Sequence, residues 1–414
     1  MSEPLDNVQE QEADTSRPFT IDRVRLRHYR SIASCDVKLD RLTLLVGANG
    51  SGKSSFLDSM RLVADSLQTT LDHALRDRGG IAEVRRRAAG HPTHFGVRLW
   101  FSFGSTKGSY GFQVAAVKGG DFRVSHEDCH ISGAERGPAD SLWPGESGFK
   151  VRDGGLINAS ENVMPRPPGP DRLYLVSASG IPAFREVYDG LAGINVYNLN
   201  PDAMRGLQTP DAGDLLRRDG ANIGSVLERL RREQPEIKER IEEYLTRIVA
   251  GISWVNRKGL GPYETVEFGQ RVAGAKSPWA FQATSMSDGT LRALGVLTAL
   301  FAGTDSHLSP IGIEEPESAL HPAAAGLLLD ALRDASSRRQ VLATSHSPDL
   351  LDSPSIKSNE ILAVNANEGQ TLIGPVDKAA RYALEESLYT PGELLRVDQL
   401  RPELSPTTQT ELFT

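Results

Sequence analysis

One octapeptide limits what this chain can fold into more than any other feature. Residues 47–54 read GANGSGKS and fit the pattern G-x-x-x-x-G-K-[ST] at every position. The apolar run "LTLLV" before it predicts a buried strand, and "SSFLDSMRLVADSLQTTLDHAL" after it has apolar residues at helical spacing. A strand, a glycine-rich loop and a helix in this order are typical of a phosphate-binding loop. The plain alternative, a flexible glycine–serine loop, would need neither flank.

The residue types of this loop suit a nucleoside triphosphate. The glycines let the backbone turn tightly and point N–H groups at phosphate oxygens, and the helix N-terminus adds its positive dipole end. Lys53 is expected to reach the β- and γ-phosphates, and the Ser54 hydroxyl to ligate Mg²⁺. The residues predicted to surround ATP are Gly47, Ala48, Asn49, Gly50, Ser51, Gly52, Lys53, Ser54 and Ser55.

A second element is the apolar run that ends in carboxylates, "IGIEEPE" at 311–317. Neighbouring residues on a strand point to opposite sides, so Glu314 and Glu315 can have separate tasks. Glu314 would approach the Mg²⁺, and Glu315 would orient an attacking water and partly deprotonate it. Taken alone, the same residues are equally typical of an acidic turn before Pro316.

Two more short runs suit the same ligand. In "SMSDGTLRAL", Ser287, Asp288 and Gly289 open a predicted helix whose free N–H groups would make a second anion site, with Ser287 as the N-cap. In "ATSHSPDLL", His346 follows a predicted apolar strand. Singly, these runs fit a plain helix cap and a structural or surface histidine at least as well.

Their order along the chain resembles the ATP-binding-cassette pattern, and within it the RecF/SMC/OLD branch of AAA-type ABC ATPases. "SMSDGT" is similar to the signature loop, "IGIEEPE" to Walker B, "SALHP" at 318–322 to the D-loop and "TSHSP" at 344–348 to the His switch. "LRHYRSI" resembles the family's entry strand, which would place Arg30 near the nucleotide. The chain is most similar to compact predicted ATPases that lack long coiled coils and a fused Toprim domain.

The resemblance implies an α/β fold: a P-loop NTPase of the ABC head type with a mixed, largely parallel sheet, an antiparallel β subdomain and a helical insertion lobe. Alternating strands and helices after residue 285 also favour a parallel layer. The expected divisions are a disordered acidic tail over 1–18, ATPase lobe I over 19–130, a loop-rich and helical insertion over 131–283, lobe II over 284–380 and a helical tail over 381–414. A break at Pro235 is expected within the insertion.

The resemblance also implies a mechanism. Two copies would form a homodimer around ATP, each signature loop closing on the ATP held by the other copy. Glu315, His346 and Lys53 would act in hydrolysis, with His346 contacting the γ-phosphate. Two features depart from the family. Glu314 stands where Asp is usual, which leaves open which carboxylate lies nearer the metal. The candidate for the Q-loop glutamine is Gln113, which fits a plain strand residue equally well.

Composition limits the partners. Net charge is −8, which does not indicate a dedicated nucleic-acid binder, although local basic runs remain candidate DNA contacts: Arg85, Arg86, Arg87, Arg217 and Arg218, with Arg229, Arg231 and Arg232. A solvated helix face with nearby glutamates explains the same runs equally well. The run "HEDCH" at 126–130 is too tightly spaced for a metal site and is expected to form a surface turn.

Two hypotheses follow. Relatives of this type act on DNA in repair, chromosome maintenance or phage defence, so the chain could be a DNA-acting ATPase. Alternatively, it could be an ATP-gated scaffold that recruits a separate Toprim nuclease or toxin, since the segment after His346 is shorter than the roughly 100 residues of a fused nuclease core. A transporter subunit fits the signature poorly. Two cysteines and no apolar run of about 18 residues predict a cytoplasmic protein without a membrane span.

Overall fold

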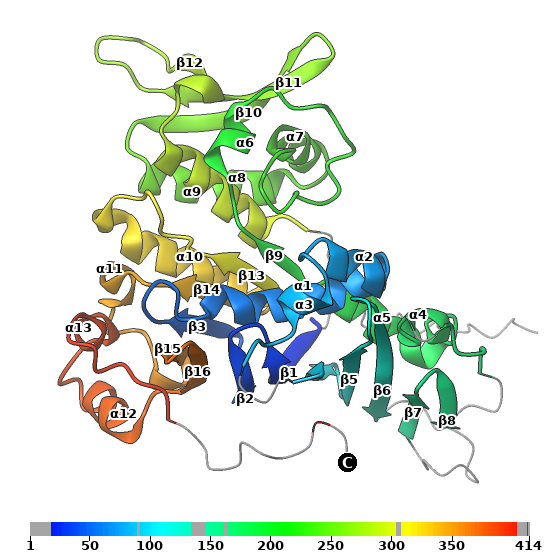
Figure 1. Cartoon of the computed structure of the whole chain (residues 1–414). Coiled ribbons are helices and arrows are strands. Elements are labelled where there is room, and N and C mark those ends of the chain that lie inside the picture. Colours follow the sequence, from blue (N-terminus) through cyan, green and yellow to red (C-terminus); the bar gives the residue numbers. More distant parts are fainter. Residues whose placement is uncertain are drawn as a thin grey trace, which may run out of the picture.

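The computed structural model describes residues 18–88, 92–133, 146–160, 164–169, 171–303, 308–403 and 412. Apart from Pro18, the predicted acidic tail lies outside these residues. Within them, thirteen strands form one mixed sheet in the order β8-β7-β6-β5-β4-β1-β2-β16-β15-β3-β14-β13-β9 (Figure 1). This α/β architecture confirms the predicted fold class, while the proposed domain boundaries stay predictions.

The parallel half of the sheet carries the sequence motifs. Its strands are β3 (Leu42–Val46), β9 (Asn195–Tyr197), β13 (Ile311–Glu314), β14 (Val341–Ser345) and β15 (Ile361–Asn367), with β16 (Gln370–Pro375) antiparallel to β15. β3 and β14 are buried along their whole length, as apolar strands covered on both faces must be. Because these strands are parallel, β3, β13 and β14 all end at the same edge of the sheet.

The other half is an antiparallel wing of long strands. It consists of β1 (Thr20–Tyr29), β2 (Ile32–Lys38), β4 (His94–Phe103), β5 (Thr106–Ala116), β6 (Phe122–Ser132), β7 (Glu146–Arg152) and β8 (Gly155–Ala159). β6 contains the whole of "HEDCH", so the predicted surface turn at 126–130 is wrong. Alternation along a strand explains the run: Glu127 and Cys129 face the core, where both are buried.

Helices cover this sheet. α1 (Lys53–Gln68) packs against α2 (Leu71–Arg76), α5 (Pro182–Ala192) and β9. The short helix α3 (Ile81–Val84) contacts α2, and α4 (Leu175–Ala178) contacts α5. Towards the C-terminus follow α10 (Ala325–Arg338), α11 (Pro348–Leu351), α12 (Lys378–Glu385) and α13 (Pro391–Arg396), with 3₁₀ turns η2 (Pro322–Ala324) and η3 (Ser358–Glu360).

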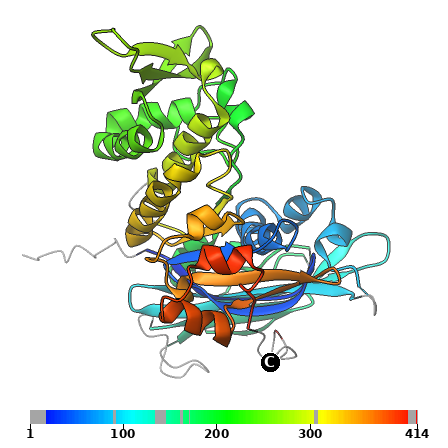
Figure 2. The same cartoon turned by 90° about the vertical axis from the view of Figure 1, so that its left-hand side faces the viewer.

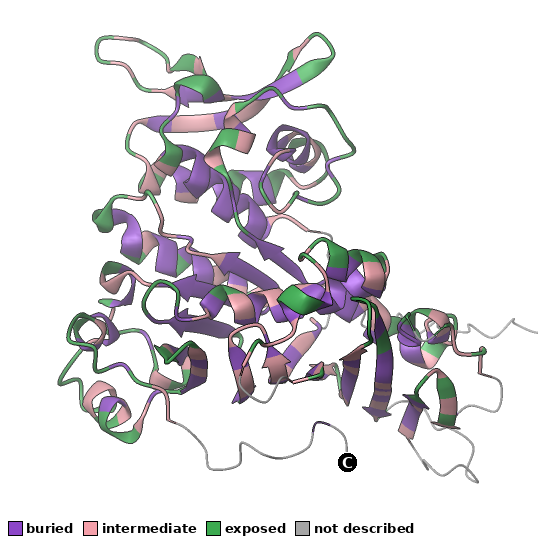
Figure 3. Cartoon of the chain, viewed as in Figure 1, coloured by how far each residue is buried: buried purple, intermediate pink, exposed green. Residues whose placement is uncertain are grey.

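An arm rises above the sheet in Figure 1 and stands apart from it in the turned view of Figure 2. It holds α6 (Pro201–Arg205), α7 (Ile223–Glu233), α8 (Pro235–Ile248), the separate sheet β10 (Ile252–Leu260), β11 (Tyr263–Gln270) and β12 (Trp279–Gln282), η1 (Ala283–Ser285) and α9 (Asp288–Phe301). The predicted break at Pro235 is confirmed, since α8 begins at that residue. α9 is buried along nearly its whole length and joins the arm to the sheet (Figure 3).

The two faces of β3 belong to different hydrophobic cores. Leu45 packs with α1 and the antiparallel wing, whereas Leu42, Leu44 and Val46 pack with α9, α10 and the arm. The loop at 47–52 therefore leaves a strand that touches both cores, as β9, β14 and β15 also do.

Glu127 anchors α4 to the wing from inside the core. Its carboxylate accepts hydrogen bonds from the backbone N–H groups of Tyr174 and Leu175 and from the Tyr110 hydroxyl, at 2.9 Å for the last two. Burial raises the pKa of Glu127 to about 7, although these three donors oppose the shift. At a pH between 4.5 and about 7, Glu127 is therefore protonated in the folded protein and ionised in the unfolded chain.

This buried carboxyl predicts a pH-dependent stability. Between the unfolded pKa of 4.5 and the folded value of about 7, its contribution falls as pH rises, by about 1.4 kcal/mol per pH unit. We expect the stability of the wild type relative to Glu127→Gln to fall over this range in urea unfolding curves. The exposed Glu239→Gln should show no such slope relative to the wild type. A pH-independent difference for Glu127→Gln would contradict the assignment.

Candidate nucleotide-binding site

The glycine-rich loop lies between β3 and α1, as predicted. Gly50 and Gly52 have positive φ angles of 75° and 106°, which only glycine adopts without strain. Close packing fixes the loop as well: a Cβ atom on Gly47 would lie 1.9 Å from the Val364 carbonyl oxygen, and one on Gly52 would lie 2.1 Å from Thr371 Oγ1. The loop is therefore pressed against β15 and β16, two strands that carried no recognised motif.

Lys53 begins α1 and turns back over the loop. Its Nζ donates to the carbonyl oxygens of Gly47 at 2.8 Å and Ala48 at 2.9 Å. Burial lowers the pKa of Lys53, while the nearby carboxylates of Glu315, Glu317 and Glu314 raise it less strongly. A buried ammonium held between a glycine-rich loop and three carboxylates suits a ligand with its own negative charge.

Ser54 and Glu314 meet across the site. Ser54 Oγ donates to Glu314 Oε2 at 2.7 Å, so the end of β13 faces the start of α1. A hydroxyl and a carboxylate are hard oxygen ligands, and Mg²⁺ binds in proteins through one or two such groups plus substrate phosphates. The pair predicted from sequence to lie near the metal is thus in contact, and its chemistry fits Mg²⁺.

Glu315 lies one residue beyond β13 in an unusual backbone conformation. Its φ is +44°, in the left-handed region that non-glycine residues rarely occupy. Its N–H donates to Thr344 Oγ1 at 3.0 Å, and its carboxylate lies 3.1 Å from His346 Nδ1 and accepts from Ser318 Oγ at 3.2 Å. The structure therefore joins the two residues predicted to act on the attacking water and the γ-phosphate.

A third carboxylate of this turn was not assigned a task from the sequence. Glu317 accepts from Ser345 Oγ at 2.6 Å, while its Oε2 is buried and has no hydrogen-bond partner in the described structure. Burial raises the pKa of Glu317, and the Ser345 hydrogen bond opposes that shift. Its place two residues after Glu315, past Pro316, was the only signal in the sequence.

The predicted signature loop caps α9. Ser287 Oγ accepts from the Thr290 N–H at 3.2 Å, and Asp288 forms an ion pair with Arg205 of α6. A Cβ atom on Gly289 would lie 2.3 Å from the Ala319 carbonyl oxygen, so glycine lets this helix end touch the predicted D-loop. Ser287, Gly289 and Ala319 line an open groove, together with Arg247, Leu320 and His321.

Arg292 connects α9 to the acidic turn. This buried guanidinium donates to the backbone carbonyl oxygens of Glu314 at 2.9 Å and Glu315 at 3.0 Å, and of Leu199 at 2.7 Å. It therefore fixes the backbone that carries both carboxylates to the helix that carries the signature loop. The sequence run "SMSDGTLRAL" contained this arginine, but helical periodicity alone gave it no partner.

Several predicted DNA contacts lie beside the glycine-rich loop instead of on a separate face. Arg85, Arg86 and Arg87 line a pocket of about 520 Å³ together with Arg30, Arg78 and Ser55. Arg86 also donates to the Ser31 carbonyl oxygen, and Arg87 pairs with Glu83. The structure thus brings Arg30 to the same pocket as Ser55, in the first turn of α1, while its place near the nucleotide stays a prediction.

The remaining predicted contacts are spread over the molecule. Gln113, the Q-loop candidate, lies in β5, donates to Ser125 Oγ at 3.3 Å and is separated from β3 by five strands in the sheet.

Among the candidate DNA contacts, Arg217 lies 3.4 Å from an Asp211 carboxylate oxygen, and Arg218 is bound to Asp65. The other arginines pair with acidic neighbours: Arg229 with Glu233, Arg231 with Glu228 and Arg232 with Glu233. Their part in DNA binding stays a prediction.

Two family models match this sequence. One, described as "AAA domain, putative AbiEii toxin, Type IV TA system", matches residues 214–352, and the other, "AAA ATPase domain", matches residues 20–107. The first spans the signature loop, the acidic turn and His346, and the second spans the glycine-rich loop. No curated protein matches the chain significantly.

Solved structures agree on the fold. The chain resembles an Smc head bound to the C-winged helix domain of ScpA, with 13% identity, 87% of this chain and 99% of that one covered, and a TM-score of 0.50. It is similar to the Pyrococcus furiosus Smc head with an extended coiled coil, bound to the C-terminal domain of ScpA, with 13% identity, 90% and 100% coverage, and a TM-score of 0.50. At this identity the match shows the fold alone.

Proposed function

We propose that this chain, an AAA-type ATPase whose fold resembles that of SMC heads, works as a switch whose two copies close around ATP. The observation that carries the proposal is the contact of three separate segments at one sheet edge, the loop at 47–54, the acidic turn at 314–317 and His346, beside the D-loop that the α9 cap touches. Within one copy, the α9 cap contacts the D-loop and lines an open groove.

The proposed roles follow from the contacts. The N–H groups of residues 47–54 and Lys53 bind the phosphates, and Glu315 accepts a proton from the attacking water. His346, beside Glu315, orients that carboxylate and contacts the γ-phosphate. Ser54 and Glu314 would hold Mg²⁺, which supplies neutralisation of charge on the phosphate oxygens. Arg30 and Arg86, which line the pocket beside Ser55, are proposed to contact the nucleotide rather than DNA.

The dimer follows from the α9 cap. An N-terminus with free N–H groups attracts an anion, and the groove beside Ser287 and Gly289 is open to solvent. A two-fold arrangement brings this groove to the γ-phosphate bound by the other copy and buries each triphosphate between two chains. Hydrolysis removes the shared anion and loosens the contact.

Ser287→Arg tests this arrangement. The long side chain fills the groove where the second copy must approach, so we expect nucleotide binding to stay within about twofold while ATP-dependent dimerisation is lost. Sedimentation with Mg·ATP and nucleotide titration measure the two effects. Ser277→Arg, at an exposed position before β12 in the arm, adds the same side chain away from this groove and should dimerise normally. A Ser287→Arg protein that dimerises like the wild type would contradict closure at the groove.

The process that this switch serves is proposed as DNA-related. The largely exposed side chains of Arg87, Arg231 and Arg232 support a DNA contact, while the family description that mentions a toxin system supports the second candidate, a scaffold that recruits an effector chain. No helix in the described part of the chain is both long and apolar enough to span a membrane. Both candidates use the same ATP-dependent dimer.

Stimulation of hydrolysis separates the two candidates. If the chain acts on DNA, duplex DNA should raise the ATPase rate, and the stimulation should fall steeply between 50 and 200 mM salt, as about 10³-fold losses in affinity are usual for several phosphate contacts. If it is a scaffold, DNA should leave the rate unchanged, and an effector should co-purify with the ATP-bound Glu315→Gln protein. A rate that DNA does not change would remove the first candidate.

A further inference from the structure

Two aspartates on α1 gather cations from distant parts of the chain. Asp58 accepts from the Tyr29 hydroxyl at 2.7 Å, pairs with Arg30 at 2.9 Å and accepts from Arg78 Nε at 3.0 Å. Asp58 and Asp65 lie on the same face of α1, because seven residues are close to two helical turns. Arg78, whose side chain is only 4% exposed, also reaches Asp65 at 2.9 Å and so links them.

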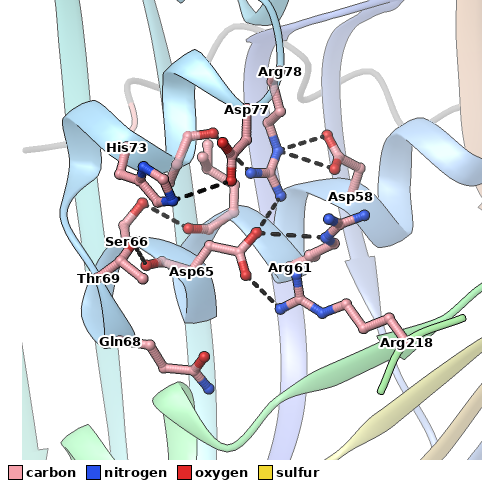
Figure 4. Close-up of polar contacts among 12 residues, drawn as sticks. Asp58, Arg61, Asp65, Ser66, Gln68, Thr69, His73, Asp77, Arg78 and Arg218 are labelled. Carbon is pink, nitrogen blue, oxygen red and sulfur yellow. Dashed lines mark hydrogen bonds and ion pairs between the residues drawn. The ribbon is translucent and has the colours of Figure 1, made fainter. Parts of the chain in front are cut away.

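Asp65 also forms an ion pair with Arg218, which comes from a part of the chain far from α1 and α2 in sequence. It lies in the segment between α6 and α7, and Figure 4 shows its guanidinium reaching Asp65 from that separate part of the chain. Burial would raise the pKa of Asp65, but the hydrogen bonds and charges of Arg218 and Arg78 lower it below its usual value. Asp65 is therefore an anion held mainly by these two arginines.

From Arg218 a run of backbone hydrogen bonds continues to the acidic turn. The Arg218 carbonyl oxygen accepts from the Asn198 N–H at 3.0 Å, just after β9. The next residue, Leu199, gives its carbonyl oxygen to Arg292 at 2.7 Å, and Arg292 holds the carbonyl oxygen of Glu315. Four consecutive contacts thus lead from Asp65 on α1 to the backbone of Glu315, whose carboxylate is proposed to act on water.

We propose that Arg218 is a positioning residue for hydrolysis, which sets the acidic turn and α9 relative to α1 through Asp65 on one side and Arg292 on the other. Asp65 lies 12 residues after Lys53, about 18 Å along α1, so Arg218 touches neither nucleotide nor metal. It acts on hydrolysis by positioning the acidic turn and α9.

The reason that placement matters lies at Glu315. This residue keeps a left-handed φ of +44°, a conformation that persists only where surrounding contacts hold it. Arg292 and Thr344 hold its two backbone polar groups. If the 198–200 segment shifts, Arg292 loses its third carbonyl oxygen and the turn is free to relax. A displacement of about 1 Å at a reacting group can cost on the order of 100-fold in rate.

Arg218→Gln tests this inference, which rests on the proposed role of Glu315. We expect the Kd for ATP, measured with a fluorescent nucleotide, to change less than twofold because the loop at 47–54 is untouched. The kcat per nucleotide-bound protein should fall about tenfold, which corresponds to 1.4 kcal/mol. The matched control is Arg185→Gln, which breaks an exposed Arg–Asp pair at 2.7 Å on α5 and should keep full kcat.

The double variant with Asp65→Asn separates positioning from general damage. If Arg218 acts through Asp65, kcat of the double variant should match that of Asp65→Asn alone. Equal kcat in Arg218→Gln and wild type, or additive losses in the double variant, would overturn the inference. If Arg218→Gln does not fold, Asp65→Asn alone replaces it, because it weakens the same ion pair, and a full kcat there is likewise contrary. Normal turnover in Glu315→Gln would instead reject Glu315 as the general base, the part of the proposed function on which this inference rests.

Discussion

Replacing Glu315 with glutamine is expected to lower ATP hydrolysis by about 10²- to 10⁴-fold while ATP remains bound, since that is the usual contribution of a general base. Glutamine keeps the size of the side chain and can still accept from Ser318, but it cannot take a proton from water. Single-turnover assays with radiolabelled ATP measure the chemical step, and filter binding measures the nucleotide retained.

Glu368→Gln is the matched control for this change. Glu368 is exposed and also has a positive φ, of 47°, so the same substitution is made in the same backbone conformation away from the site. It should hydrolyse ATP at the wild-type rate. If Glu315→Gln also turned over normally, another carboxylate would have to act on the water. Glu317, buried beside Ser345, would then be the first candidate for the general base.

Loss of the Lys53 ammonium is expected to abolish ATP binding in the micromolar range. Lys53→Ala removes a charged donor to two phosphates, and hydrogen bonds to charged groups are worth about 1.5–3 kcal/mol each, so affinity should fall on the order of 100-fold or more. The substitution also leaves Glu314, Glu315 and Glu317 without their nearby cation, which increases repulsion of the triphosphate. Isothermal titration with a non-hydrolysable ATP analogue measures the effect.

Lys118→Ala removes an exposed lysine from the end of the antiparallel wing and should bind the analogue as the wild type does. Thermal unfolding of both variants shows whether the fold is kept. Because Lys53 donates to the carbonyl oxygens of Gly47 and Ala48, some loss of loop order is expected without ligand. Retained binding by a folded Lys53→Ala protein would mean that backbone N–H groups alone hold the phosphates.

The parts of the site that local sequence encodes were predictable. The strand, loop and helix over 42–68, the helix that begins after Ser287 and the strands that precede Glu315 and His346 are each signalled by an apolar run next to a polar motif. The order of these motifs then predicted that they share one ligand. Spatial contact between Ser54 and Glu314, 260 residues apart, bears out their expected proximity.

Other features depend on contacts that no local pattern reveals. β15 and β16 insert between β2 and β3 and press Val364 and Thr371 against Gly47 and Gly52, yet their sequences resemble any pair of short strands. "HEDCH" looked like a turn because its polar residues hide the alternation of a strand with one buried face. The arginines at 85–87 read as a free basic run, but the hydrogen bond from Arg86 to Ser31 brings them beside the nucleotide loop.

The molar mass of the Glu315→Gln protein in solution, with and without saturating Mg·ATP, tests the central claim most directly. Light scattering behind a sizing column should show one chain of 45.0 kDa without nucleotide and twice that mass with it. Ser287→Arg in the same background should remain a monomer in both conditions. A Glu315→Gln protein that binds ATP yet keeps the mass of one chain would contradict closure of two copies around the triphosphate.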